Sequence, residues 1–230
     1  MRLTDVGDNS HPLLGPGKIT GAHELGPFPD AQVASTIAVM RRRVIEDCYN
    51  PDFRSHAARV LNWISEPDSV SAAWRQTRNA INFVHDKELA GDIPGVNQDN
   101  VVEFIIRPLE MARLIDRGTA HGDCDDFCMY CECLLECCGI PTSFVTVAAD
   151  DSQPDQYSHV YVRAYPYENG RKGDYVALDP SHGAYPGWEC PDYFGKQKEW
   201  PVDQPFLWSG FAELAAASLF IGFMVWWAVR

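Results

Sequence analysis

The stretch His121-Gly122-Asp123-Cys124-Asp125-Asp126-Phe127 opens a predicted helix over residues 124–138. Gly139 and Pro141 end that helix, since glycine suits a left-handed cap and proline cannot continue a helix. Apolar residues form one stripe about 120° wide along this helix, which predicts that the helix faces the core. The stripe contains Cys124, Phe127, Cys128, Cys131, Leu134, Leu135 and Cys138. We expect Asp123 to be the N-cap and Asp126 its capping-box partner. Cys124 then lies in the first turn, where backbone N–H groups and the helix dipole favour a thiolate.

Two strand-like segments follow, and each carries a polar candidate. In residues 159–165 polar and apolar positions alternate from His159 onward, and residues 175–179 alternate up to Asp179. Asn169-Gly170 predicts a hairpin turn between them. We expect His159 and Asp179 to lie nearly opposite each other, with Cβ atoms about 4.5–5.5 Å apart.

This order of residues predicts a thiol acyl-transfer site. Cys124 would be the nucleophile, His159 the base, and Asp179 the group that orients the imidazole. The backbone N–H of Cys124 and one further donor would stabilise the oxyanion. Further candidates are Trp63, Trp74 and Tyr157 as that second donor, His121 as a residue lining the cleft, and His182 as a second-choice base.

Four short motifs in this part of the chain resemble those of the transglutaminase-like superfamily of cysteine enzymes. They are Gly122-Asp123-Cys124-Asp125-Asp126, Leu134 to Pro141, Ser158 to Val162, and Val176 to Pro180. The resemblance covers roughly residues 30–185 and is greatest to short members found in bacteria and tailed phages. It implies a papain-like α+β fold with nucleophile, base and orienter at Cys124, His159 and Asp179. The superfamily includes cross-linking enzymes, peptidases and inactive relatives.

Changes in composition along the sequence divide the chain into four parts. Residues 1–30, rich in Gly, Pro, Asp and His, predict an irregular arm, and residues 31–190 the transglutaminase-like domain. Residues 191–210 are a Trp- and Pro-rich linker, and residues 211–230 an apolar helix. Within the domain we expect helices over 31–48, 52–64, 68–84 and 108–115, an apolar segment at 101–106, and a loop from Asp86 to Asn100. The predicted fold class is therefore α+β, with a helical N-terminal half and an antiparallel sheet packed on the nucleophile helix.

Charge and cysteine placement exclude several classes of function. The net charge of −13 argues against nucleic acid as a partner. Six of the eight cysteines lie on the helix predicted over 124–138, where most pairs cannot adopt disulfide geometry. The N-terminus has no apolar segment typical of a signal peptide. We expect a reducing, intracellular location.

Cys124, Cys128 and Cys131 also match the three-cysteine spacing of radical S-adenosylmethionine enzymes, which bind an iron–sulfur cluster. That motif belongs on a loop, and here the three thiols lie along a periodic helix. Ligands spread along one helix cannot converge tetrahedrally on zinc either. We therefore expect neither a metal nor another cofactor.

The apolar stretch 211–229 predicts a helix that meets either a membrane or another protein. We favour a cysteine peptidase or amidase that acts on a protein or peptide. A cross-linking transglutaminase is one alternative. The other is a non-catalytic assembly module, for instance a component of a phage particle.

Overall fold

The computed structural model describes residues 2–6, 22–24, 29–61, 66–91, 102–192 and 194–202. Trp63, the predicted helix at 211–230 and residues 203–210 of the predicted linker lie outside the described residues. Within the described ranges, no helix is both long enough and apolar enough to cross a membrane.

The chain forms a mixed α+β structure. Its helices are α1 (Pro29–Cys48), α2 (Pro51–Leu61), α3 (Glu66–Ala80), α4 (Asp86–Gly91), α5 (Pro108–Arg117) and α6 (Cys124–Cys137). Its strands are β1 (Arg2–Val6), β2 (Ala22–Glu24), β3 (Asn82–Phe83), β4 (Val102–Ile106), β5 (His121–Gly122), β6 (Thr142–Val147), β7 (His159–Ala164), β8 (Tyr167–Glu168), β9 (Arg171–Lys172), β10 (Val176–Leu178) and β11 (Gln197–Pro201).

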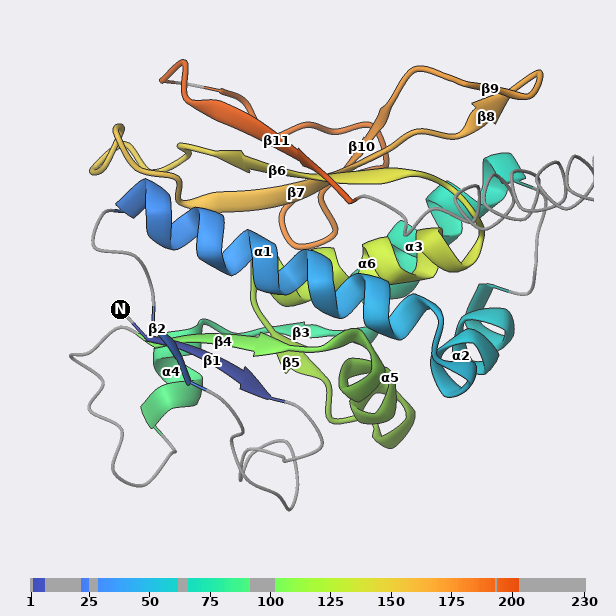
Figure 1. The fold of residues 1–230 in the computed structure, drawn as a ribbon, viewed down its shortest axis with the longest axis horizontal. Coiled ribbons are helices and arrows are strands. Elements are labelled where there is room, and N and C mark those ends of the chain that lie inside the picture. The colour runs from blue at the N-terminus through green and yellow to red at the C-terminus, as the bar shows by residue number, and fades with distance from the viewer. Residues whose placement is uncertain are drawn as a thin grey trace, which may run out of the picture.

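The largest sheet has four antiparallel strands in the order β10-β7-β6-β11. Figure 1 shows α1 and α6 running along the same side of this sheet. The helix α6 contacts β6 and β7 on its sheet side, and α1, α3 and α5 on its other sides. The predicted packing of the nucleophile helix on an antiparallel sheet is therefore present.

The helix α6 is buried more completely than a single apolar stripe predicts. Every residue from Asp125 to Cys137 is buried. Cys133 and Cys137, which lie off the predicted stripe, face α1: their thiols donate hydrogen bonds to the carbonyls of Val44 (3.7 Å) and Cys48 (3.5 Å). The prediction of one buried stripe is wrong because other elements surround this helix.

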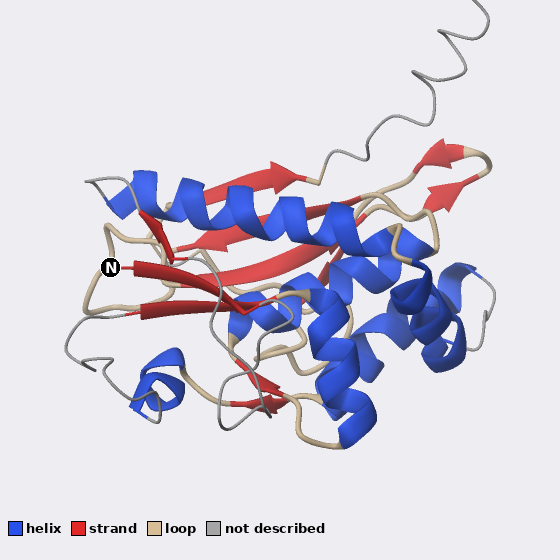
Figure 2. Ribbon diagram, turned by 60° about the horizontal axis from the view of Figure 1, so that its bottom comes forward, coloured by secondary structure: helices blue, strands red, loops and turns tan. Residues whose placement is uncertain are grey.

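Smaller sheets complete the other side of the molecule, as Figures 1 and 2 show. The strand β1 pairs antiparallel with β2 and parallel with β4. Residues 1–30 thus contain two strands where the sequence predicts an irregular arm. The predicted loop from Asp86 to Asn100 likewise begins with the helix α4. In both places, pairing or packing with distant segments outweighs local composition.

A second small sheet positions the start of α6. The strand β5 pairs parallel with β3, and the N–H groups of Asn82 and Val84 donate to the carbonyls of Ala120 (3.0 Å) and Gly122 (2.9 Å). These bonds fix the backbone immediately before Cys124. The first turn of α6 therefore has a defined position relative to the rest of the domain.

Candidate active site

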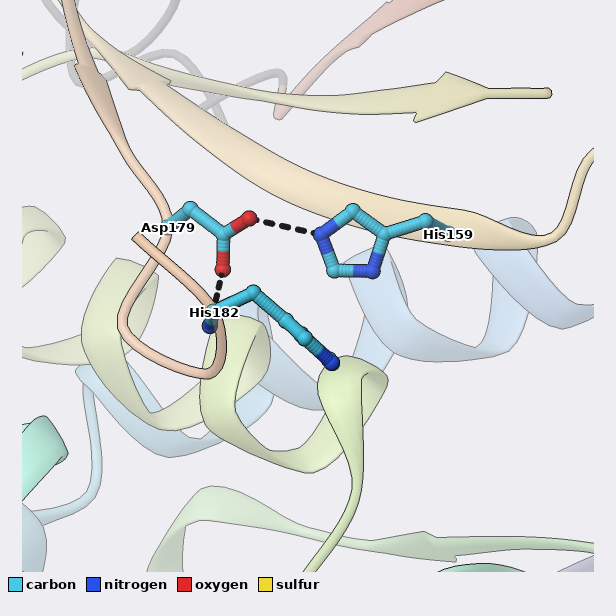
Figure 3. A group of neighbouring side chains, drawn as sticks. All are labelled: His159, Asp179 and His182. Carbon is cyan, nitrogen blue, oxygen red and sulfur yellow. Dashed lines mark hydrogen bonds and ion pairs between the residues drawn. The ribbon is translucent and has the colours of Figure 1, made fainter. Parts of the chain in front are cut away.

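His159 and Asp179 form a direct contact on the sheet. His159 is the first residue of β7, and Asp179 directly follows β10. The imidazole Nε2 lies 2.7 Å from the Asp179 Oδ2, as Figure 3 shows. The predicted hydrogen-bond reach between the two residues is confirmed.

The register of the two strands makes this contact diagonal. Leu178 pairs with Val162, so Asp179 lies two residues away from the position directly opposite His159. The hairpin turn is where the sequence predicts it, with Asn169 and Gly170 both at positive φ (51° and 73°). The two residues are therefore nearly opposite each other, as expected, and their contact is diagonal rather than direct. Diagonal neighbours on adjacent strands remain within reach of longer side chains.

Asp179 is fully buried and accepts several hydrogen bonds. Its Oδ1 accepts from the Ser181 hydroxyl (2.9 Å) and from the His182 N–H (2.8 Å). Burial alone would raise the pKa of the Asp179 carboxyl. The hydrogen bonds from His159, His182 and Ser181, together with the charge of His159, bring this pKa below its ordinary value. Asp179 is therefore a carboxylate at neutral pH.

Trp74 supports Asp179 through the backbone. Its indole Nε1–H donates to the Asp179 carbonyl at 3.0 Å. Indole has a single N–H donor, so this contact occupies it. The prediction of Trp74 as an oxyanion donor is corrected: the tryptophan holds the backbone of Asp179.

The contact with Asp179 decides the protonation pattern of the His159 ring. When Nε2–H donates to the carboxylate, the neutral ring keeps Nδ1 as its acceptor. In Figure 3 this second nitrogen points away from Asp179, toward the side where the N-terminal turn of α6 lies. The ring is oriented as a proton acceptor facing that turn.

Cys124 begins α6 and is half-buried. It lines the same cavity as His159, together with Tyr157. The N–H of Val160 donates a hydrogen bond to its sulfur and favours the thiolate. Burial, followed by the negative charges of Asp123 and Glu103, raises the pKa of the Cys124 thiol well above its usual range. The resting group is therefore a thiol, and thiolate formation needs a base.

The cavity has a volume of about 260 Å³ and lies between α1, the start of α6 and the sheet. Apolar side chains of α1 form one wall, namely Val33, Ile37 and Met40. Three acidic residues, Glu103, Asp123 and Asp125, also line it. Tyr157, a candidate for the second oxyanion donor, also lines the cavity.

The two other candidate histidines have different surroundings. His121 Nδ1 lies 2.8 Å from the Thr119 carbonyl, and the ring is not part of the cavity wall. Its prediction as a cleft residue is therefore wrong. The His182 ring packs edge-to-face on His159, with centroids 4.8 Å apart. Loss of solvation and the charge of His159 lower the pKa of His182, so its ring is neutral beside the pair.

A group of buried carboxyls surrounds the start of α6, and the sequence analysis missed its long-range members. Asp126 Oδ1 accepts from the Ile106 N–H (2.6 Å), and Asp86 Oδ2 from the Phe104 N–H (2.5 Å). Both bonds tie β4, which carries Glu103, to the neighbourhood of Cys124. No local pattern links residues so far apart in sequence.

Asp123 occupies the N-cap position of α6 as predicted, but its side chain makes no capping hydrogen bond. Gly122 is required here by space: a Cβ at this position would lie 2.5 Å from Asp126 Oδ2. The Asp126 carboxyl therefore fills the room that a side chain at residue 122 would need.

Within the described ranges, two groups bring three potential metal-ligand atoms within 4.8 Å of one another. They are His159, Asp179 and His182, and Asp123, Asp125 and Asp126. Neither contains a cysteine. The Cys128 thiol instead donates to the Val160 carbonyl at 3.3 Å, and Cys131 bonds with Thr77. The thiols required for an iron–sulfur cluster therefore have separate partners.

The fold and this site define an α+β protein with a thiol, an imidazole–carboxylate pair and buried acids around one cavity. Neither a protein-family profile nor a curated protein matches the chain. Among solved structures it is similar to a "putative protease" from Parabacteroides distasonis, with 14% identity and a TM-score of 0.43, over 77% of this chain and 30% of that one. It is also similar to a "putative cysteine protease" from Cytophaga hutchinsonii, with 17% identity and a TM-score of 0.38, over 80% of this chain and 62% of that one. The chain thus spans less than two thirds of the length of either structure.

Proposed function

We propose that the chain is a thiol-dependent acyl-transfer enzyme of papain-like or transglutaminase-like type that hydrolyses a peptide or carboxamide bond. The observation that carries this proposal is the His159–Asp179 pair (2.7 Å) beside the cavity that Cys124 lines at the start of α6. A thiol, a base with a free acceptor nitrogen and a buried orienting carboxylate are the groups that this chemistry needs.

In the proposed reaction, His159 Nδ1 takes the Cys124 proton as the sulfur attacks the substrate carbonyl carbon. The oxyanion accepts hydrogen bonds from the Cys124 backbone N–H and from the Tyr157 hydroxyl, the second-donor candidate that lines the cavity. The C–N bond then breaks, His159 returns its proton to the leaving amine, and a thioester remains. Water, deprotonated by His159, attacks the thioester and releases the acid and the thiol.

The acceptor in the second half of the reaction separates two activities. Water gives a peptidase or amidase, and a lysine amine gives a cross-linking transferase. We favour the hydrolase, because the sequence motifs resemble those of short microbial members.

A specific observation favours a second candidate function, a non-catalytic module that retains the fold. Burial and nearby acids raise the pKa of the Cys124 thiol, which opposes nucleophile activation. In such a module the His159–Asp179 contact would contribute only to stability. Thiol reactivity distinguishes the two functions directly.

The test uses a peptide chloromethyl ketone, an amide mimic whose chloride the thiolate displaces to form a thioether. The full-length protein is labelled and the modified residue is mapped by mass spectrometry. We expect labelling at Cys124, slowed by His159→Ala and absent in Cys124→Ala.

Cys138 provides a matched control, because it is also half-buried and lies at the opposite end of the same helix. Cys138→Ala should leave the labelling unchanged. Labelling of Cys124 no faster than that of Cys138, and insensitive to His159→Ala, would establish the non-catalytic function.

A further inference from the structure

The cavity beside Cys124 has an acidic wall. Glu103 comes from β4, and Asp123 and Asp125 from the start of α6. Among the described residues that line this cavity, there is no lysine or arginine. The acids therefore face the cavity without a compensating positive charge from its own wall.

Two of these acids, Asp123 and Asp125, place their carboxyls against each other, and each has a buried oxygen atom that no N–H or hydroxyl group reaches. Asp125 is only 2% exposed, and its Oδ2 is buried without a hydrogen-bond partner. The Oδ1 atom of Asp123 is likewise buried without a hydrogen-bond partner. Asp125 Oδ1, by contrast, accepts from the Asp126 N–H at 2.8 Å. A buried carboxylate oxygen without a donor is costly, so these oxygens favour a ligand that donates hydrogen bonds.

The protonation behaviour of the acids agrees with this geometry. Burial, followed by the charge of Asp123, raises the pKa of Glu103 to about 8. The same two causes, in the same order, raise the pKa of Asp125 well above its usual range. Both carboxyls lack a cation that would favour their charged forms.

We propose that this cavity binds a basic side chain of the substrate, lysine or arginine, with its cationic head among Glu103, Asp123 and Asp125. The inference rests on the proposed function and names its substrate class. The apolar α1 wall, formed by Val33, Ile37 and Met40, would contact the aliphatic stem. An ammonium or guanidinium group would supply the missing donors to the buried oxygens.

The shape of the cavity favours a side chain over a metal ion. A divalent ion would contact only the carboxylates, whereas the cavity of about 260 Å³ is also lined by the apolar side chains of α1 and by Tyr157. An extended ligand with one charged end and an apolar stem matches both parts.

Binding of a cation here would also activate the nucleophile. Asp123 and Glu103 are the two charged groups that most raise the pKa of the Cys124 thiol. A positive group between them would offset their repulsion of the thiolate and lower this pKa. A basic substrate would therefore increase both binding and thiolate formation, while a neutral one would leave the thiol protonated.

The test compares two peptide chloromethyl ketones that differ only in lysine against norleucine, which keeps the stem and lacks the charge. We expect the second-order rate constant for labelling Cys124 to be about tenfold or more higher with the lysine probe, as one charge-assisted hydrogen bond implies. The pH profile of the limiting rate should also be shifted to lower pH with lysine, which a merely larger contact area would not produce.

In Glu103→Gln, the rate constants for labelling Cys124 with the lysine probe and with the norleucine probe should become nearly equal. Glu168→Gln makes the same Glu-to-Gln replacement on the exposed β8–β9 hairpin and should keep the lysine preference. Equal rates for both probes on the wild type, with Cys124 still labelled, would overturn the inference and leave the proposed function standing. No labelling by either probe would overturn both.

A further experiment tests whether the carboxylates bind a divalent metal ion instead. If dialysed protein retains one equivalent of a divalent ion, or if added Ca²⁺ or Mg²⁺ blocks the lysine preference at micromolar concentration, the carboxylates bind a metal and the inference is wrong. We expect neither, and an unchanged preference in EDTA supports the basic side chain.

Discussion

Replacement of Asp179 by asparagine tests the imidazole–carboxylate pair with almost no change in volume. One side-chain oxygen can still accept from the Ser181 hydroxyl and the His182 N–H, as Oδ1 does now at 2.9 and 2.8 Å. The amide NH₂ then faces His159 Nε2 and can only donate to it. This reverses the tautomer of the ring: Nε2 becomes the acceptor and Nδ1 carries the proton.

The reversed tautomer cannot take a proton from Cys124 at Nδ1. Because general-base assistance contributes about 10²–10⁴ in rate, we expect Asp179→Asn to lower chloromethyl ketone labelling of Cys124 by at least about 10² at neutral pH. The variant should also lose about 2 kcal/mol of stability, since hydrogen bonds to a charged acceptor contribute about 1.5–3 kcal/mol and neutral ones about 0.5–1.5.

The stability difference has a defined pH dependence. The folded pKa of Asp179 lies below its ordinary value of 3.8. Its contribution is therefore present above pH 4 or so and is lost as the pH falls through the folded pKa. Urea unfolding of both proteins at several pH values should show the free-energy difference narrowing at the acidic end.

Ser181→Ala is the matched control, because it removes one hydrogen bond to the same carboxylate and leaves the His159 contact in place. We expect a loss of about 1.5–3 kcal/mol in stability, as for a hydrogen bond to a charged acceptor, and a labelling rate close to that of the wild type. If Asp179→Asn retained wild-type labelling while losing stability, the pair would be structural and the proposed role of His159 as base would be refuted.

Three further changes follow from the geometry. Gly122→Ala places a Cβ 2.5 Å from Asp126 Oδ2 and should lower the unfolding free energy by about 1–3 kcal/mol; an unchanged melting temperature would contradict this. Trp74→Phe removes the 3.0 Å bond to the Asp179 carbonyl and should cost about 1 kcal/mol with slower labelling; equal labelling would show that the bond does not position the pair. The pKa of the Glu103 carboxyl rises from 4.5 to about 8 on folding. Protonated Glu103 therefore stabilises the folded protein at low pH, and this stabilisation is lost as the pH rises from 4.5 to about 8. Glu103 alone contributes a slope of about 1.4 kcal/mol per pH unit, so the slope in urea titrations should be smaller by this amount in Glu103→Gln, and equal slopes would contradict the buried acid.

Local patterns in the sequence are sufficient to predict the helix α6 and the pairing of His159 with Asp179. Both follow from short-range rules: a cap and a breaker around a periodic segment, and a two-residue turn at Asn169-Gly170 between alternating strands. The turn position alone leaves the strand register open by a residue or two, so the diagonal geometry of the contact could not be predicted.

The features that the sequence analysis missed depend on contacts between distant segments. Asp86 and Glu103 reach the start of α6 from α4 and β4, which no periodicity in the sequence relates to Cys124. The complete burial of α6 likewise depends on α1 and α3 packing around it. The role of Trp74 follows from one long-range hydrogen bond, so its residue type alone could not distinguish an oxyanion donor from a backbone support.

The central claim is that Cys124 is activated by His159, and its most direct test is a rate profile of the thiols with iodoacetamide across pH. Cys124 and Cys138 are both half-buried, at opposite ends of α6. The account predicts that Cys124 reacts faster at neutral pH, that its rate follows the titration of an imidazole, and that His159→Ala removes this advantage. Equal rates for Cys124 and Cys138, unchanged by His159→Ala, would contradict it.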